Sequence, residues 1–315
     1  MIAFTFPGQG SQRPGAGAPW RHTPSWDIVR AASDAARRDI GHLLLDADAD
    51  ELRLTHNAQL STYVASLVVL DAVRRVGLDA SYVAGHSLGE YTALTAAGVL
   101  SLEDGVRLVV ERGDAMRAAT EERVGTMAAV LGAPGAEDTV EAACAEARDA
   151  GHEVWVANYN APGQVVIAGS PSGIEAAGTA AKARGAKRVL PVAVSGAFHT
   201  PYMAPAQARL DAAIASARFG HAAVPVAANV DAATHTRAAD WPGLLSRQLC
   251  APVRWAQLLG TLAAGGVDTF VELGPGTVLS GLAKRGVEGS THAAATPEEA
   301  AGLAGELSGR ARPTP

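Results

Sequence analysis

Short apolar runs alternate with longer amphipathic stretches over most of the chain. Ile2–Phe6 and Tyr82–Ala84 are apolar runs of strand length. Residues 58–76 place apolar side chains at helical spacing, and residues 102–119 form a second helical stretch that begins after the capping residue Ser101. Strands that alternate with helices in this way predict an α/β fold, in which a mostly parallel sheet carries helices on both faces.

The order of predicted strands and helices changes after Gly125. Six elements are predicted in the order strand, helix, strand, strand, helix, strand, over Thr126–Leu131, 135–150, Val154–Ala157, Val165–Ala168, 171–183 and Arg188–Val192. The polar segment 158–163 is expected to be the loop between the second and third strands. This order is the ferredoxin-like pattern, which can fold as its own small layer. We therefore expect 125–193 to be a subdomain inserted into a core formed by 1–124 and 194–290.

The second part of the core continues the alternation. Its predicted elements are helices at 201–217, 240–249, 255–264 and 276–285, and strands at Val224–Ala228 and Val267–Leu273. The tail, 291–315, is rich in Ala, Glu and Pro, and is expected to hold one short helix and a frayed end.

Composition narrows the class of protein. The chain has 315 residues, of which 48% are hydrophobic and 18% charged, as expected for a folded globule. Two cysteines, Cys144 and Cys250, provide neither a disulfide framework nor a metal cluster and fit a reducing cytoplasm. The amino-terminal residues have no basic flank or long apolar segment, so no signal peptide or membrane span is expected. The net charge of −6 argues against bulk nucleic-acid binding.

Positive charge is nevertheless concentrated in one stretch. No acidic residue lies between Glu175 and Asp211, whereas five basic residues do: Lys182, Arg184, Lys187, Arg188 and Arg209. Without local acidic neighbours, this stretch is either a solvated face or a docking patch for an acidic partner.

The segment Gly85-His86-Ser87-Leu88-Gly89 is the strongest chemical signal. A serine between glycines, after a strand and before a helix, builds a nucleophile elbow, in which a strained turn lifts the hydroxyl above the sheet. The N–H of the following residue, at the start of the helix, can then face an oxyanion. The alternative is an ordinary tight turn, because this pentapeptide pattern also occurs by chance.

A nucleophilic serine needs a base, and His199 is the best candidate. It lies in Gly196-Ala197-Phe198-His199, between a strand and a helix, where active-site loops are common. His86 points to the other side of the turn and is given a supporting role. No acid between Ser87 and His199 has a persuasive context, the nearest being Asp104 and Asp138, so a Ser–His dyad oriented by a main-chain carbonyl stays open.

A set of motifs then appears in a specific order. They are Phe6-Pro7-Gly8-Gln9-Gly10-Ser11-Gln12, Gly85-His86-Ser87-Leu88-Gly89-Glu90-Tyr91, Arg112-Gly113, Asn158-Tyr159-Asn160-Ala161-Pro162-Gly163-Gln164, Gly196-Ala197-Phe198-His199, Arg247-Gln248-Leu249 and Glu272-Leu273-Gly274-Pro275-Gly276. Together they closely resemble malonyl-CoA:acyl-carrier-protein transacylases and the acyltransferase domains of polyketide synthases, from about residue 1 to 286. The resemblance implies an α/β-hydrolase-like large subdomain with a ferredoxin-like insertion.

The resemblance also implies roles. Ser87 would be the nucleophile and His199 its base, oriented by the main-chain carbonyl of Gln248. The N–H groups of Gln9 and Leu88 would form the oxyanion hole.

Substrate contacts follow from the same resemblance. Arg112 would hold the free carboxylate of a malonyl group in a two-pronged pair, and Asn160 would also bind substrate. Phe198, together with Leu88 after the serine, indicates malonyl rather than methylmalonyl. Gly196 is closer to the free-standing transacylases than to polyketide domains.

The implied reaction is ping-pong acyl transfer through a malonyl-serine ester, from malonyl-CoA to the phosphopantetheine thiol of an acidic acyl carrier protein. It needs no metal or redox cofactor. The expected protein is a monomer that docks its carrier at Lys182, Arg184, Lys187 and Arg188. Three alternatives stay open: a discrete acyltransferase that moves a larger acyl group between carriers, a thioester hydrolase, and a carrier-binding scaffold with a relic site.

Overall fold

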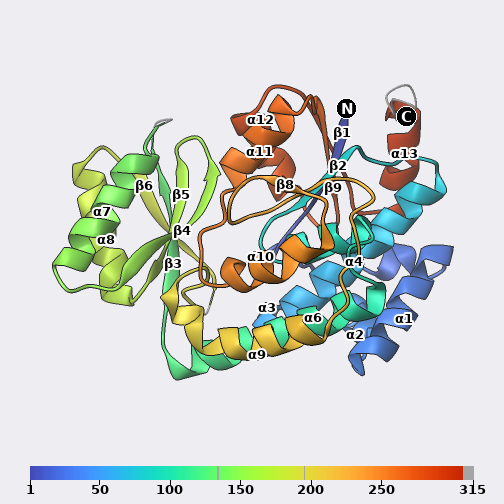
Figure 1. The fold of residues 1–315 in the computed structure, drawn as a ribbon, viewed down its shortest axis with the longest axis horizontal. Helices are drawn as coiled ribbons and strands as arrows, with labels where there is room; N and C mark the ends of the chain where they lie inside the picture. Colours follow the sequence, from blue (N-terminus) through green and yellow to red (C-terminus); the bar gives the residue numbers. More distant parts are fainter. Residues whose placement is uncertain (133–134, 195, 308–315) are drawn as a thin grey trace.

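The computed structural model describes residues 1–132, 135–194 and 196–307 and consists of two lobes (Figure 1). Strands β3–β6 with helices α7 and α8 form the small lobe, drawn in green and yellow, which spans residues 126–192. The remaining elements form the large lobe, which includes the amino-terminal strand and the last helix. The chain therefore leaves the large lobe after α6 and returns to it before α9.

A six-stranded sheet is the centre of the large lobe, in the order β10-β9-β1-β2-β7-β8. The five strands from β10 to β7 are parallel, and β8 runs antiparallel to β7. The strands are β1 (Ile2–Phe6), β2 (Tyr82–Gly85), β7 (Val226–Ala227), β8 (Thr234–His235), β9 (Thr269–Leu273) and β10 (Ser290–Ala294). This arrangement confirms the predicted parallel-rich α/β core.

Helices of the large lobe surround this sheet. They are α1 (Asp27–Ala36), α2 (Ile40–Leu45), α3 (Ala49–Arg53), α4 (Thr55–Arg75), α5 (Gly89–Ala96), α6 (Leu102–Glu122), α9 (Ala204–Ser216), α10 (Trp241–Gln248), α11 (Trp255–Ala264), α12 (Val278–Gly286) and α13 (Pro297–Leu307). Short 3₁₀ turns occur at Ala18–Trp20, Pro24–Trp26, Pro201–Met203 and Ala238–Asp240. None of the described helices is long and apolar enough to cross a bilayer. The hydroxyl of Ser101 accepts a hydrogen bond from the N–H of Asp104 at 3.0 Å, which confirms the predicted start of α6.

Both faces of the large sheet are buried. Along β1, Ile2, Phe4 and Phe6 point into a core shared with α4, whereas Ala3 points into a second core with Trp255 of α11. A strand that is apolar on both faces is what a parallel sheet between two helical layers requires. The first strand could therefore be recognised from its continuous apolar run.

The small lobe is an antiparallel sheet in the order β4-β5-β3-β6, with α7 (Glu137–Asp149) and α8 (Pro171–Ala183) packed on it. Its strands are β3 (Thr126–Leu131), β4 (Val154–Ala161), β5 (Gln164–Gly169) and β6 (Arg188–Val192). This order and the β-α-β-β-α-β sequence are those of a ferredoxin-like fold, as predicted.

Two expectations from the sequence are wrong. The expected loop 158–163 is mostly strand: β4 continues to Ala161, because it pairs with β5 as far as Ala161 opposite Gln164. The large lobe also contacts this end of β4, where Tyr159 N–H donates to Val253 O and Val253 N–H donates to Ala157 O, both at 2.9 Å. The expected tail 291–315 begins inside β10, which pairs with β9 at the edge of the large sheet. The sequence of β10 lacks an apolar run because most of its residues are only half-buried. The expected frayed end at 308–315 lies outside the described residues.

Candidate active site

Ser87 lies in the tight turn between β2 and α5, with a left-handed φ of 54°. The two flanking glycines are required by close packing. A Cβ on Gly85 would lie 1.8 Å from the carbonyl carbon of Gly89, and one on Gly89 would lie 2.0 Å from Phe6 O. The turn therefore has the strained geometry expected of a nucleophile elbow.

His199 reaches Ser87 from the segment before α9. Its Nε2 lies 2.7 Å from Ser87 Oγ, and its Nδ1 lies 3.0 Å from the main-chain oxygen of Gln248. Because a carbonyl only accepts, Nδ1–H donates to Gln248 O, which leaves the lone pair of Nε2 facing the hydroxyl. Of the acids considered from the sequence, Asp104 pairs with Arg107 at the start of α6, and the orienting partner of His199 is the carbonyl.

The imidazole of His199 is buried and close to a guanidinium. Burial first, and the charge of Arg112 second, lower the pKa of His199 to about 3. The resting histidine is therefore neutral, the form that can accept the Ser87 proton. This geometry supports the base role without an acidic third member.

The lowered pKa predicts an unusual pH profile for Ser87 acylation. Because the neutral form is kept until the pH falls towards about 3, the acylation rate should stay nearly flat between pH 8 and pH 5. A base with an ordinary pKa of ~6.5 would lose about thirtyfold at pH 5. The profile can be measured by quenching the reaction at set times and following acyl-enzyme formation by intact-protein mass. A drop with its midpoint near pH 6.5 would contradict the neutral, buried base.

Arg112 places a buried positive charge next to the hydroxyl. Its side chain comes from α6 and is only 1% exposed. Nη2 lies 3.1 Å from Ser87 Oγ and 3.2 Å from Gln248 Oε1, and Nη1 donates to Gln59 Oε1 at 2.7 Å. Its guanidinium carbon lies 5.4 Å from the centre of the Tyr91 ring. Three polar side chains therefore fix this guanidinium next to the Ser87 hydroxyl.

Two main-chain N–H groups lie beside the serine without an acceptor in the described part of the chain, those of Gln9 and Leu88. Leu88 lies at the N-terminus of α5, where the helix dipole favours negative charge. The loop that carries Gln9 lies against the elbow, because a Cβ on Gly8 would be 2.6 Å from His86 O. The role of both donors in an oxyanion hole stays a prediction from the resemblance.

A pocket of about 330 Å³ opens between the lobes, and Gln9, Ser87, Arg112 and His199 line it. The small lobe contributes Asn160 and Val192, and the large lobe contributes Phe198. Asn160 Oδ1 accepts a hydrogen bond from His86 Nε2 at 2.8 Å, which gives His86 the expected supporting position. Burial lowers the pKa of His86, so this imidazole also favours its neutral form.

Gly196 packs closely against Thr120 and Phe198. A Cβ on Gly196 would lie 2.3 Å from the Thr120 methyl carbon and 3.0 Å from Cε1 of the Phe198 ring. A larger residue would therefore clash with Thr120 and would also press on the Phe198 ring, which lines the pocket beside the nucleophile.

Three buried polar residues of the site were not predicted: Gln59, Glu90 and Asn229. Gln59 holds Arg112, and Asn229 and Glu90 support the elbow. Burial raises the pKa of Glu90 to about 8, although its two N–H donors and Arg112 oppose this rise. Two of these residues could have been noticed in the sequence: Gln59 lies within an apolar helical stretch, and Glu90 comes directly after the elbow.

The predicted docking residues lie on the small lobe, but not all of them are free. Lys182 and Arg184 lie at the end of α8, and Lys187 and Arg188 lie at the start of β6. Arg184 pairs with Glu146 of α7, and Arg209 pairs with Glu111 and Asp114 of α6. The expectation that all five charges lack acidic neighbours is therefore wrong, because helices far away in sequence supply carboxylates. Within the described residues, Lys182, Lys187 and Arg188 form no ion pair and are exposed.

Comparisons with known proteins agree with this geometry. The model of the family described as "Acyl transferase domain" matches residues 3–309. A protein of Escherichia coli strain K12 named malonyl CoA-acyl carrier protein transacylase is 42% identical over 312 residues, which cover 98% of this chain and 99% of that protein.

Solved structures show the same similarity. An acyl-carrier-protein S-malonyltransferase from Burkholderia pseudomallei 1710b has a TM-score of 0.90 at 41% identity, over 95% of this chain and 97% of that one. A malonyl-transacylase bound to its type II polyketide-synthase acyl-carrier protein has a TM-score of 0.90 at 38% identity, over the same shares of the two chains. With a serine elbow, its histidine and a match over nearly its whole length, this chain belongs to the acyl transferase domain family.

Proposed function

We propose that this protein transfers a malonyl group from malonyl-CoA to the phosphopantetheine thiol of an acyl carrier protein, in fatty-acid or polyketide synthesis. The buried guanidinium of Arg112, 3.1 Å from the Ser87 hydroxyl, carries this proposal, because it matches an acyl group that ends in a carboxylate. The names of the similar transacylases, and the solved complex of one with its carrier, support it.

In the first half-reaction, Ser87 Oγ attacks the thioester carbonyl while its proton moves to His199 Nε2. The tetrahedral oxyanion accepts hydrogen bonds from the N–H groups of Gln9 and Leu88. When the intermediate collapses, the C–S bond breaks and the CoA sulfur leaves with the proton from His199. The products are free CoA and a malonyl ester of Ser87.

In the second half-reaction, the carrier thiol attacks the ester carbonyl and His199 accepts the thiol proton. Collapse of the second intermediate breaks the C–O bond and returns the proton to Ser87 Oγ. Each proton therefore passes through Nε2, while Nδ1–H stays bound to Gln248 O. The steps require only the chain's own residues, malonyl-CoA and the carrier thiol, with no metal or redox cofactor.

The choice of acyl group depends on the wall of the pocket. Phe198 favours malonyl over methylmalonyl, because its ring lines the pocket beside the nucleophile and narrows the space for an α-methyl group. Leu88, after the serine, fits the malonyl-type pattern of the resembling family. An extra methyl group changes discrimination by only ~1–3 kcal/mol, so the preference should be graded rather than absolute.

A panel of acyl-CoA thioesters tests the proposed substrate class. After brief incubation, intact-protein mass should show efficient acylation by malonyl-CoA, weaker acylation by methylmalonyl-CoA and little by acetyl-CoA. Preferred acylation by a large neutral acyl group would instead support an acyltransferase that moves such groups between carriers.

We propose that the partner is an acidic carrier. We also propose that the protein is a monomer and binds no nucleic acid. Lys187 and Arg188 lie at the exposed start of β6, and Val192, at the end of the same strand, lines the pocket. Four residues of extended chain span about 13 Å, so a carrier docked on these charges lies near the pocket entrance. The two free thiols, Cys144 and Cys250, support a cytoplasmic location.

Charge reversal tests the docking face. The double variant Lys187→Glu with Arg188→Glu should raise the KM for the carrier and weaken its salt dependence, because like charges then oppose docking. Acylation by malonyl-CoA should be nearly unchanged, since the carrier is absent from that step. Reversal of Arg21 and Arg218 to Glu is the charge-matched control, because both are exposed residues of the large lobe that form no ion pair within the described residues. Equal carrier kinetics in the two double variants would show that the basic stretch is only a solvated face.

A further inference from the structure

Asn229 contacts the nucleophile turn from the segment after β7. Its side chain is fully buried, with 0% exposed. The amide oxygen, Oδ1, accepts a hydrogen bond from Ser87 N–H at 2.7 Å, and the amide nitrogen, Nδ2, donates to Gly85 O at 2.7 Å. One side chain therefore binds both sides of the turn that presents the Ser87 hydroxyl.

Glu90 links Asn229 to the support of the histidine. One carboxyl oxygen accepts a hydrogen bond from the main-chain N–H of Asn229 at 2.9 Å, and the other accepts one from Gln248 Nε2. Gln248 Nε2 also donates to Ser87 O at 2.9 Å, while the main-chain oxygen of Gln248 holds His199. The supports of the nucleophile and of its base thus meet at one buried carboxylate.

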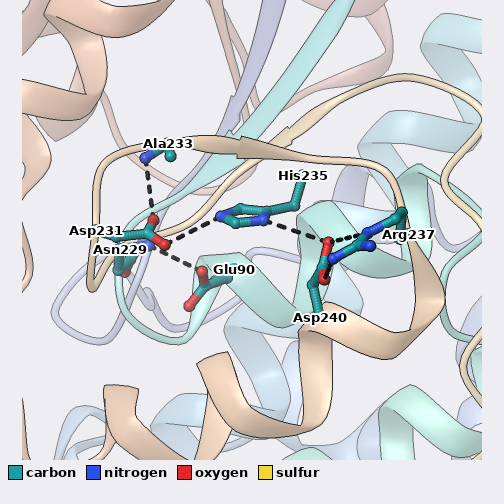
Figure 2. A network of polar contacts seen from close by, with 7 residues as sticks. All are labelled: Glu90, Asn229, Asp231, Ala233, His235, Arg237 and Asp240. Carbon is teal, nitrogen blue, oxygen red and sulfur yellow. Dashed lines mark hydrogen bonds and ion pairs between the residues drawn. The ribbon is translucent and has the colours of Figure 1, made fainter.

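The turn that carries Asn229 is also anchored from outside (Figure 2). Asp231 accepts a hydrogen bond from Ala233 N–H at 3.0 Å, and His235 lies between Asp231, at 3.1 Å, and Asp240, at 3.5 Å. Arg237 also pairs with Asp240, at the start of α10. These outer groups are partly exposed, so each pair contributes little, whereas the amide contacts of Asn229 are fully buried.

We propose that Asn229 is a positioning residue for the nucleophile: it holds Ser87 in the left-handed conformation that directs Oγ towards His199 Nε2. The left-handed region is unfavourable for a serine, so its surroundings must fix it. The two side-chain hydrogen bonds of Asn229 fix the backbone at Gly85 and at Ser87, and Glu90 holds the main chain of Asn229 itself. The inference rests on the proposed role of Ser87 as the acylated residue.

The variant Asn229→Asp tests this assignment with almost no change of shape. One carboxylate oxygen can still accept from Ser87 N–H, but the other replaces the Nδ2 donor and faces Gly85 O without a hydrogen. At pH 8 the first-order rate of Ser87 malonylation should fall by about 10- to 100-fold with a small change in the KM for malonyl-CoA, because misplaced reacting groups cost roughly this much. As the pH falls to 5.5, the introduced carboxyl group gains a proton, can donate to Gly85 O and should recover much of the rate. Glu90, whose pKa burial raises to about 8, gains a proton over the same range in both proteins, so the recovery is measured as the rate relative to wild type at each pH.

Two further variants separate positioning from folding. Asp231→Asn makes the reverse isosteric change two residues along the same turn, on its outer side, and should keep the rate within twofold. Asn229→Ala removes both hydrogen bonds without adding a charge, and should lose rate equally at pH 8 and pH 5.5. Its fold can be checked by thermal unfolding.

Two results would overturn the assignment. One is malonylation of Asn229→Ala at the wild-type rate, and the other is a slow Asn229→Asp variant whose rate does not recover at low pH. Failure of the proposed function itself is distinct, because wild-type protein would then gain no malonyl group on Ser87 at any pH.

Discussion

Ser87→Ala is expected to keep its unmodified mass after incubation with malonyl-CoA, whereas the wild-type protein gains one malonyl group. The hydroxyl lies 2.7 Å from the neutral base and 3.1 Å from the guanidinium, and alanine removes the only atom in that position that can form the ester. Intact-protein mass spectrometry measures the result directly. Ser216→Ala, which removes an exposed hydroxyl on α9, is the matched control and should be malonylated like the wild type.

A malonyl adduct that persists in Ser87→Ala would contradict the assignment of the nucleophile. The site of the adduct, located by peptide mapping, would then identify the true acylated residue. Loss of the adduct in both Ser87→Ala and Ser216→Ala would point to a general defect of folding rather than to chemistry.

Arg112→Ala is expected to lose malonyl transfer by hundredfold or more and acetyl transfer by much less. Breaking one side of a buried charge pair costs about 3–5 kcal/mol, and only the malonyl group has the carboxylate that forms this pair. Acetyl transfer should still fall somewhat, because Gln59 and Gln248 lose their shared donor. The measurement is kcat/KM for acylation by the two thioesters.

Arg112→Lys is the informative companion variant. It keeps the charge but loses the planar fork, so its malonyl preference should lie between those of wild type and Arg112→Ala. Equal losses for malonyl and acetyl in Arg112→Ala would assign a structural role to the arginine and would weaken the malonyl proposal.

Local patterns predicted the parts of the fold that local sequence determines. The apolar run of β1, the capped start of α6 at Ser101 and the glycines of the elbow each have a short-range physical cause, and all lie as predicted. The chemistry of Ser87 and His199 could be predicted for the same reason: each lies where a strand meets a helix.

Contacts between distant segments could not be predicted in this way. Val253, for example, comes from the other lobe and exchanges hydrogen bonds with Ala157 and Tyr159 of β4. Asn229 meets Ser87 across 142 positions and Gln59 meets Arg112 across 53, and a single sequence does not reveal such pairs. Likewise, the partners of Arg184 and Arg209 come from α7 and α6.

The most direct test of the proposed reaction starts from isolated malonyl-enzyme. Wild-type protein is loaded with malonyl-CoA, freed of CoA and mixed with holo acyl carrier protein, and both proteins are then followed by intact mass. The ping-pong mechanism predicts that the carrier gains one malonyl group as the enzyme loses it, and that Ser87→Ala transfers none. Loss of malonate to water at the same rate with or without the carrier would contradict transfer and would show a thioester hydrolase instead.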